Sequence, residues 1–334
     1  MPRIAVLSTA HVHSRSFLKT LQENSAGKCA HVIWDDMAGR GKAYAAEFGT
    51  TYSGDLDAVL AGKAVDGFLI CAENTRHLPL LQKVLPVGKP VMCEKPLATN
   101  VEDARATAAL LRKHKTPLIS GYFQPFFAPN RGVKKLLKES ALGKVTHANF
   151  CNAHHAAYGH WFDKPEVAWF AEPELSGGGA LLDMGTHAVH LLRHLFGPVK
   201  EVWSLNANYS GIYTKVDDYG VIMLRFASGV LGRVEAGWVF TGGQGGLEVI
   251  GSEKSLWNTA AGLVVGGPKL KPEPAPVDEA RPDRIARLLA VIEGKVAQDE
   301  LAEDLAACLD AVTIMAAAYE SNRTGTWQPV AALY

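Results

Sequence analysis

The sequence predicts an α/β protein with two domains. The first is a doubly wound parallel sheet, and the second is an α+β domain with an open, mostly antiparallel sheet. Short apolar runs alternate with helical patterns over about the first 120 residues. After about residue 122 the pattern changes to longer strands with alternating polar and apolar side chains. The chain of 334 residues is also longer than one ordinary core supports.

In the first domain, a polar turn and a helical pattern follow most of the short apolar runs. Right-handed crossovers between such strands build a parallel sheet, whose ligands bind beyond the carboxyl ends of the strands. The expected strands are residues 4–7, 31–34, 65–71, 90–93 and 117–121. The expected helices include residues 17–21, 43–48, 78–85 and 101–114.

The second domain is expected to present one sheet face to its own helices and the other to substrate or a partner subunit. Residues 269–276 are rich in proline and lysine and are interpreted as a connector. The expected strands are residues 145–151, 199–209, 219–226, 230–240 and 247–250. Leucine and alanine periodicity predicts helices over residues 283–293 and 301–319. The predicted domains are residues 1–121 and 122–334.

The composition is typical of a globular protein and excludes several function classes. Lys plus Arg and Asp plus Glu balance at 34 each, so no overall field attracts nucleic acid or an anionic membrane. No apolar run reaches the roughly 18 residues that span a bilayer, and the first strand begins too early for a signal peptide. Five scattered cysteines favour reduced thiols. We therefore expect a cytoplasmic protein with a small-molecule substrate.

The turn after the first strand is where a dinucleotide binds in a doubly wound sheet. The usual fingerprint places three glycines there, which lets the backbone and a helix N-terminus approach the pyrophosphate. In this chain Ser8, Ala10 and His13 stand at the glycine positions. Either the turn is a modified cofactor site with Ser8, Thr9 and His13 as donors, or it has lost the cofactor. The candidate cofactor-binding residues of the turn are Ser8, Thr9, Ala10, His11, Val12 and His13.

An acidic residue at the end of the second strand favours cofactor binding. Asp35 is expected to accept the adenosine ribose hydroxyls and to repel a 2′-phosphate, which favours NAD over NADP. Asp36 adds a second negative charge, whereas Arg40 could still serve a phosphate. Acids in such turns are also common helix caps.

Residues 176–194 carry the most informative pattern. Three glycines precede an apolar helical pattern, in which Asp183 and His187 lie four residues apart. On a helix this spacing stacks the two side chains on one face. A carboxylate beside an imidazole is a general base with an orienting partner, as needed to take a proton from a hydroxyl. The alternative interpretation is a helix cap and a structural histidine.

Three blocks, in their order and spacing, resemble the Gfo/Idh/MocA family of nicotinamide-dependent sugar and polyol oxidoreductases over essentially the whole chain. They are residues 71–77, residues 94–96 at the end of the fourth strand, and residues 177–187. The resemblance implies a Rossmann domain and assembly into dimers or tetramers. It also implies that Lys95 binds the reacting hydroxyl, that His187 exchanges the proton, and that Asp183 orients His187 or shares the proton relay. The Lys95–Pro96 peptide bond is expected to be cis.

The resemblance extends the candidate cofactor site beyond the first turn. The chain departs from the family pattern at the glycine fingerprint, at His190, where an acid is common, and in residues 121–130, which lack the common arginine. The first departure concerns cofactor affinity, and the other two concern substrate contacts. For His77 and Glu94 a structural role is the alternative. The added cofactor-binding candidates are Cys71, Ala72, Glu73, Asn74, His77, Glu94 and Lys95.

A cluster of histidines and aromatic residues follows the first strand of the second domain. There an aromatic ring is expected to cover the apolar face of a sugar, and a histidine to bind its hydroxyls. The alternatives are a plain surface loop and a zinc site. Adjacent His154 and His155 would point to opposite faces of a strand, so we predict no metal site. The candidate substrate-binding residues are Lys95, Gln124, His155, Tyr158, Trp161, Asp183 and His187.

These observations lead to three hypotheses of function. The first is an NAD-dependent dehydrogenase that acts on a secondary hydroxyl of a sugar, polyol or glycoside as a homodimer or homotetramer. The second is an NAD-dependent glycosidase, in which transient oxidation permits elimination of the glycosidic substituent before the hydride returns. The third is a non-catalytic sensor or partner subunit that has lost its cofactor.

Overall fold

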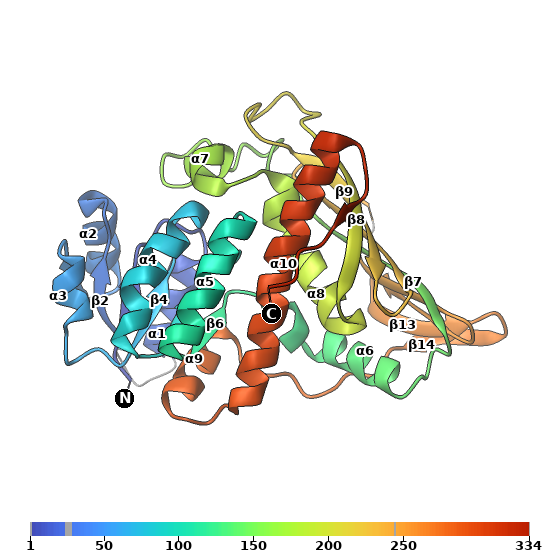
Figure 1. Cartoon of the computed structure of the whole chain (residues 1–334), viewed down its shortest axis with the longest axis horizontal. Helices are drawn as coiled ribbons and strands as arrows, with labels where there is room; N and C mark the ends of the chain where they lie inside the picture. The colour runs from blue at the N-terminus through green and yellow to red at the C-terminus, as the bar shows by residue number, and fades with distance from the viewer. Residues whose placement is uncertain (1, 24–28, 244, 334) are drawn as a thin grey trace.

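The first domain is built on a six-stranded parallel sheet, as the alternation of strands and helices predicts. The computed structural model describes residues 2–23, 29–243 and 245–333 (Figure 1). The strands are β1 (Ile4–Leu7), β2 (Ala30–Trp34), β3 (Thr51–Ser53), β4 (Gly67–Ile70), β5 (Val91–Cys93) and β6 (Leu118–Ser120). Their order is β3-β2-β1-β4-β5-β6, so the carboxyl ends of β1, β4 and β5 are neighbours. The edge strand β3 is not among the expected strands, because its three residues include no buried side chain.

Helices cover both faces of this sheet. They are α1 (Ser14–Glu23), α2 (Ala38–Glu47), α3 (Leu56–Leu60), α4 (His77–Val84) and α5 (Val101–His114), with short turns η1 (Asn74–Arg76) and η2 (Leu85–Val87). Because side chains alternate along a strand, Ala5 and Leu7 pack in one apolar cluster, whereas Ile4 and Val6 pack in another. Burial on both faces explains why β1 is a continuous apolar run.

The second domain contains a nine-stranded, mostly antiparallel sheet, which confirms the predicted fold class. Its strands are β7 (Val145–Ala153), β8 (Val199–Ala207), β9 (Tyr219–Phe226), β10 (Leu231–Gly237), β11 (Gly246–Gly251), β12 (Ser255–Thr259), β13 (Gly262–Gly267), β14 (Leu270–Pro274) and β15 (Gln328–Pro329). The order is β14-β13-β12-β11-β7-β10-β9-β8-β15. Among the described strands of this second sheet, only β10 and β7 pair in parallel.

The interpretation of residues 269–276 as a connector is wrong for most of that segment. Residues 270–274 form strand β14, which pairs with β13 at the edge of the sheet. All of its residues are exposed, so burial leaves no alternating pattern in the sequence. Proline is tolerated there because an edge strand has one side without ladder partners.

The helices of the second domain cover one face of its sheet and reach back to the first domain. They include η3 (Gln124–Phe126), α6 (Ala128–Lys138), η4 (Ala168–Ala171), α7 (Pro173–Ser176), the π-helical turn η5 (Leu181–Gly185), α8 (Thr186–Phe196), α9 (Arg284–Ile292) and α10 (Gln298–Thr324). Helix α10 contacts α8 and β8 on one side and α5 and β6 on the other (Figure 1).

Helix α9 packs on the first sheet, although it follows the second sheet in the chain. Ile285 and Leu288 of α9 lie in the same apolar cluster as Ile4 of β1, and α9 contacts α1 and β5. The chain therefore returns to the first domain after the predicted boundary at residue 121. No helix in the described residues is both long and apolar enough to cross a membrane.

Candidate active site

An ion pair between the two domains forms the charged centre of the site. Lys95 follows β5, and its Nζ donates to Asp183 Oδ1 at 2.7 Å and to the Asp183 backbone oxygen at 3.1 Å. Trp238 Nε1 donates to Asp183 Oδ2 at 3.0 Å. Burial alone would raise the pKa of Asp183, but the Lys95 ammonium lowers it below its ordinary value. Asp183 is therefore charged and holds the ammonium in place.

A π-helical turn changes the expected relation between Asp183 and His187. The turn covers Leu181–Gly185, and α8 begins directly after it. Because a π turn holds more residues than an α turn, side chains four positions apart no longer stack on one face. Among the described residues no hydrogen bond joins Asp183 to His187, and the carboxylate faces Lys95 and Trp238 instead. The Asp183 carboxylate therefore holds Lys95 and not His187.

His187 presents a neutral imidazole to the site. Its ring lies 5.1 Å from the ring of Phe123 and 5.9 Å from that of Tyr122, measured between centroids. Burial, with Lys95 as the next contribution, lowers the pKa of His187 well below its ordinary value. Its Nδ1 is buried and has no hydrogen-bond partner in the described part of the chain. A neutral imidazole can accept a proton from a hydroxyl.

The glycines ahead of the π turn permit close backbone packing. Gly177 has φ +76°, a left-handed conformation that favours glycine. A Cβ on Gly179 would lie 2.0 Å from the backbone oxygen of Asp217. The Asp217 carboxylate in turn accepts from the backbone N–H groups of Gly179 at 3.2 Å and Leu181 at 2.7 Å. These contacts fix the start of the π turn and hence the position of Asp183.

The turn after β1 is held from both domains. Ser8 adopts φ +67°, the left-handed conformation that a glycine takes easily. The backbone N–H and the hydroxyl of Thr9 both donate to Asp35 Oδ2, each at 2.8 Å. The carbonyl oxygen of the small, buried Ala10 accepts from Trp169 Nε1 of the second domain at 3.0 Å. The turn therefore keeps a defined shape without the usual glycines.

Asp36, rather than Asp35, is the acid that lines a cavity at this end of the turn. Asp35 is 1% exposed, and its carboxylate accepts hydrogen bonds from Thr9 and from the Arg40 guanidinium, the latter at 2.9 Å. Asp36 lines a cavity of about 180 Å³ and pairs there with Arg76. The ribose contact that the sequence assigns to Asp35 therefore fits Asp36 better.

His11 offers an unpaired hydrogen-bond donor. Its Nδ1 accepts from the backbone N–H of His13 at 3.2 Å, so the neutral ring carries its proton on Nε2. Burial lowers the pKa of His11 well below its ordinary value, which keeps the ring neutral. Nε2 is buried and has no partner within the described residues. Buried donors are usually satisfied, so this N–H points to a ligand oxygen.

A charged cluster lies beneath His11. His13 Nδ1 is 2.9 Å from Glu94 Oε1, and Arg284 Nη1 is 3.2 Å from the same oxygen. The buried Glu94 also accepts from the Lys95 backbone N–H at 2.8 Å. Ligand atoms of His11, His13 and Glu94 lie within 4.8 Å of one another, close enough to hold a metal ion. Arg284 already supplies positive charge, and the proton on His11 Nε2 blocks coordination there. We keep the prediction of no metal.

About half of the predicted residues line two separate cavities at the first turn. The larger cavity, of about 540 Å³, lies between the two domains. Its lining includes His11, Val12, His13, Lys95, Gln124, Trp161, Asp183 and His187. The smaller cavity, of about 180 Å³, is lined by Ser8, Asp36, Ala72 and Glu73 among others. The turn thus separates a space at its Asp36 end from a space at its Lys95 end.

Several predicted cofactor residues line neither cavity, and three of them are held inside the protein. Cys71 is fully buried, and burial raises the pKa of its thiol well above the ordinary value. Asn74 Nδ2 donates to the backbone oxygen of Ser176 at 2.8 Å. His77 Nδ1 lies 2.7 Å from the carbonyl oxygen of Pro96, whose peptide bond with Lys95 is cis as expected. Burial of Cys71 and the contacts of Asn74 and His77 thus keep their side chains away from both cavities.

The predicted substrate residues of the second domain do not all line the same cavity. Trp161 lines the interdomain cavity and stacks on His154 with 4.7 Å between ring centroids. His155 lines an adjoining cavity instead. Tyr158 is half-exposed and lines neither of these two cavities. Its predicted contact with substrate has no support in this geometry.

Two residues that contact the site were not predicted from the sequence. Trp238, which bonds Asp183, follows β10, and Arg284, which contacts Glu94, begins α9. Both lie far in sequence from their partners, so no local spacing indicates the contact. The one available signal is that buried tryptophan and arginine need hydrogen-bond partners.

Comparisons with known proteins agree with this architecture. Residues 3–122 match the model of an oxidoreductase family with an NAD-binding Rossmann fold, and residues 130–257 match the Gfo/Idh/MocA C-terminal domain. A solved structure of levoglucosan dehydrogenase in complex with NADH and L-sorbose covers 100% of both chains, with TM-score 0.81 and 19% identity. At that identity the likeness shows the fold.

Curated relatives match parts of the chain. A segment of 221 residues is 28% identical to 2,7-anhydro-N-acetylneuraminate hydratase of Escherichia coli (strain K12), covering 64% of this chain and 57% of that protein. Another 221 residues are 28% identical to 1,5-anhydro-D-fructose reductase of Ensifer adhaerens, covering 66% and 65%. The chain thus spans less than two thirds of these relatives' lengths. Fold and family models together show that the chain belongs to the Gfo/Idh/MocA family of oxidoreductases, with an NAD(P)-binding Rossmann domain.

Proposed function

We propose that this protein is an NAD-dependent dehydrogenase that transfers a hydride between nicotinamide and a secondary hydroxyl of a sugar, polyol or glycoside. The observation that carries the proposal is one cavity lined by Lys95, Asp183 and His187. An ammonium ion and a neutral imidazole beside one hydroxyl are the groups that its oxidation requires. The relative named 1,5-anhydro-D-fructose reductase supports a carbohydrate substrate.

The residues of the first turn fit a nicotinamide dinucleotide. The cavity beside Ser8 and Asp36 would hold the adenosine end. The unpaired Nε2–H of His11 and the Lys95 ammonium would face the other end. Bound there, the cofactor supplies a hydride acceptor for the carbon that carries the hydroxyl. In this turn Ser8 adopts the left-handed conformation, and Ala10 has the small side chain, that glycines would supply.

The chain's own groups account for the proton and the developing charge. Two donor contacts of the Lys95 ammonium go to Asp183, which leaves a third N–H for the substrate oxygen. Positive charge there stabilises the alkoxide that forms as the hydride leaves. His187 accepts the hydroxyl proton during oxidation, because its lowered pKa keeps it neutral beforehand. In the reverse reaction, the protonated His187 gives the proton back.

Replacing Asp36 with alanine is expected to shift binding from NADH toward NADPH at least tenfold. The substitution removes a carboxylate that repels a 2′-phosphate. It also removes one of the two carboxylate partners of Arg76, which keeps Glu73 at 3.5 Å and can then bind that phosphate. The ratio of the two dissociation constants from fluorescence titration measures the shift. Asp57→Ala is the control, since Asp57 is an exposed acid paired with Lys83. An unchanged ratio in the Asp36 variant would assign the preference to other residues.

Oxidation of a sugar or polyol by the purified protein tests the proposed function. With NAD and a panel of sugars and polyols, at least one alcohol should produce NADH, followed by its ultraviolet absorbance. NAD at about 100 times its dissociation constant should also stabilise the fold by about 2.7 kcal/mol, seen as a raised Tm. No thermal shift with NAD or NADP would contradict the proposal and favour a cofactor-free sensor or partner subunit.

A second candidate is a reaction in which the oxidation is transient. It is favoured by the relative named a hydratase, an activity without net oxidation. In an NAD-dependent glycosidase, a keto group would acidify the neighbouring C–H, whose proton and the glycosidic substituent are then eliminated. Water would add to the double bond that is left, and the hydride would return to the keto carbon. Release of the aglycone without accumulation of NADH would distinguish this reaction from net dehydrogenation. Assembly into a homodimer or homotetramer stays a prediction in either case.

A further inference from the structure

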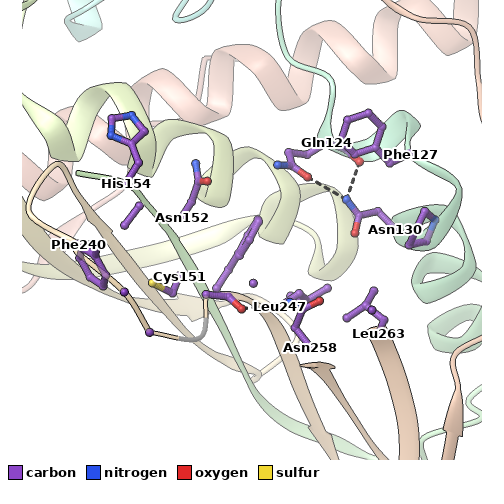
Figure 2. Close-up of a pocket in the computed structure, with 18 of the residues that line it drawn as sticks. Gln124, Phe127, Asn130, Cys151, Asn152, His154, Phe240, Leu247, Asn258 and Leu263 are labelled. Carbon is purple, nitrogen blue, oxygen red and sulfur yellow. Dashed lines mark hydrogen bonds between the residues drawn. The ribbon is translucent and has the colours of Figure 1, made fainter. Parts of the chain in front are cut away.

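A second cavity adjoins the interdomain cavity and has no part in the reaction described above. Its volume is about 690 Å³, and it lies between the segment of η3 and α6 and the strands β7, β11, β12 and β13 (Figure 2). Gln124, Asn152 and His154 line both cavities. A ligand seated at Lys95 can therefore continue past these three side chains into the second cavity.

A residue that lines both cavities is hydrogen-bonded to the π turn that carries Asp183. Asn152, near the end of β7, donates through Nδ2 to the backbone oxygen of Met184 at 2.8 Å. Met184 follows Asp183 in the π turn. Deeper in the second cavity, Phe150 of β7 pairs in register with Leu247 of β11, so their side chains share a face of the sheet.

The second cavity has few ionisable side chains in its lining. None of its described lining residues is Asp, Glu, Lys or Arg. Its polar side chains include the amides of Gln124, Asn130, Asn152 and Asn258. Amides both donate and accept hydrogen bonds, as an array of hydroxyls requires. The rings of Phe127 and Phe240 add apolar surface, and Phe127 is 50% exposed. This combination suits a sugar ring, which has a hydroxyl edge and an apolar C–H face. The described lining offers no Lys or Arg to pair with a carboxylate or phosphate.

Gln124 is held at the junction by Asn130. Asn130 Nδ2 donates to the backbone oxygen of Gln124 at 2.7 Å and to its Oε1 at 3.1 Å. The amide nitrogen of Gln124 is thereby directed away from Asn130, on the side of Asn152 and His154 (Figure 2). A preset donor at this point can bind a hydroxyl or the bridging oxygen of a ligand that passes from one cavity to the other.

The volumes of the two cavities indicate which part of a ligand each cavity can hold. The interdomain cavity, of about 540 Å³, has to hold both the nicotinamide end of the cofactor and the reacting ring. Pockets for small ligands have volumes of about 300–1,000 Å³. The volume of the second cavity alone lies within this range. A group attached to the reacting ring would therefore extend into the second cavity.

We propose that the second cavity is a subsite for a neutral sugar ring attached to the ring that reacts, so that the substrate is a glycoside or disaccharide and not a free monosaccharide. This inference rests on the proposed function and names its substrate class. Phe127 contacts the apolar face of the second ring, and Gln124 binds near the link between the rings. Aromatic contact and hydroxyl binding together select a neutral, ring-shaped substituent.

Matched sugars test the subsite. Initial rates with NAD are measured for the disaccharides maltose, cellobiose and lactose and for the monosaccharides D-glucose and D-galactose. In the wild-type protein, kcat/KM for at least one disaccharide should exceed that of its component monosaccharides tenfold or more. Phe127→Ala should lower this ratio at least tenfold, and Phe127→Tyr should keep it. Tyr209→Ala is the control, because Tyr209 is an exposed aromatic residue that lines neither of the two cavities.

Failure of the subsite differs from failure of the proposed function. Oxidation of monosaccharides with equal or higher kcat/KM, or a ratio that Phe127→Ala does not change, overturns the subsite and leaves the dehydrogenase intact. If none of these sugars is oxidised, maltose and cellobiose are titrated by calorimetry against the wild-type and Phe127→Ala proteins in the presence of NADH. Binding that weakens at least tenfold in the variant supports the subsite, and absent or equal binding overturns it.

Discussion

Lys95→Met is expected to lower kcat at least 100-fold while NADH binding changes by less than about tenfold. Methionine has similar length but no charge, so the developing alkoxide loses its stabilising cation. Removal of one such preorganised donor costs about 10²–10³ in kcat in other enzymes. The measurement is steady-state kinetics with fluorescence titration of NADH. A variant that keeps near-normal kcat would show that the assigned mechanism is wrong.

A second effect of the same substitution separates catalysis from structure. Lys95→Met leaves the Asp183 carboxylate without its ammonium partner, and breaking a buried pair by removing one partner costs about 3–5 kcal/mol. The double variant Lys95→Met/Asp183→Asn carries no unpaired charge and should recover most of that stability. Its kcat should remain as low as in the single variant. Recovery of activity together with stability would assign Lys95 a purely structural role.

His187→Gln is expected to lower kcat by a factor of about 10²–10⁴, because the residue that accepts the hydroxyl proton is lost. The pH profile gives an independent readout. Since the pKa of His187 is lowered by burial and by Lys95, the wild-type base stays neutral as the pH falls through 6.5. The acid limb of kcat therefore lies below pH 6.5 in the wild type and is absent in the variant.

His190→Gln is the matched control for this prediction. His190 lies on the same helix and is equally buried, but it stacks on Tyr122 and contacts Cys308 instead of lining the interdomain cavity. Its pKa is lowered by burial to about 3. The His190 variant should lose stability and keep the acid limb. If both variants changed the pH profile alike, His187 would not be the base.

Much of the fold could be predicted because the relevant signals are local. The continuous apolar run at residues 4–7 and the alternation in residues 219–226 reflect burial on two faces and on one face of a sheet. Strands β3, β14 and β15 escaped prediction for the same reason, since edge strands that bury no side chain carry no burial pattern. Strands β12 and β13, which bury only one residue each, were not predicted either. The sequence predicted many residues of the candidate site but not which of them contact one another.

By itself the sequence determined that Lys95, Asp183 and His187 exist on a two-domain α/β chain, with a first turn free of glycine. Only the tertiary structure decided which groups meet. Asp183 faces Lys95 and Trp238 because a π turn, set by close packing on Asp217, breaks the helical spacing to His187. The second cavity likewise arises where α6 and the far strands of the second sheet face each other. Contacts of this kind depend on how elements that are distant in the sequence pack against each other, so no local sequence pattern predicts them.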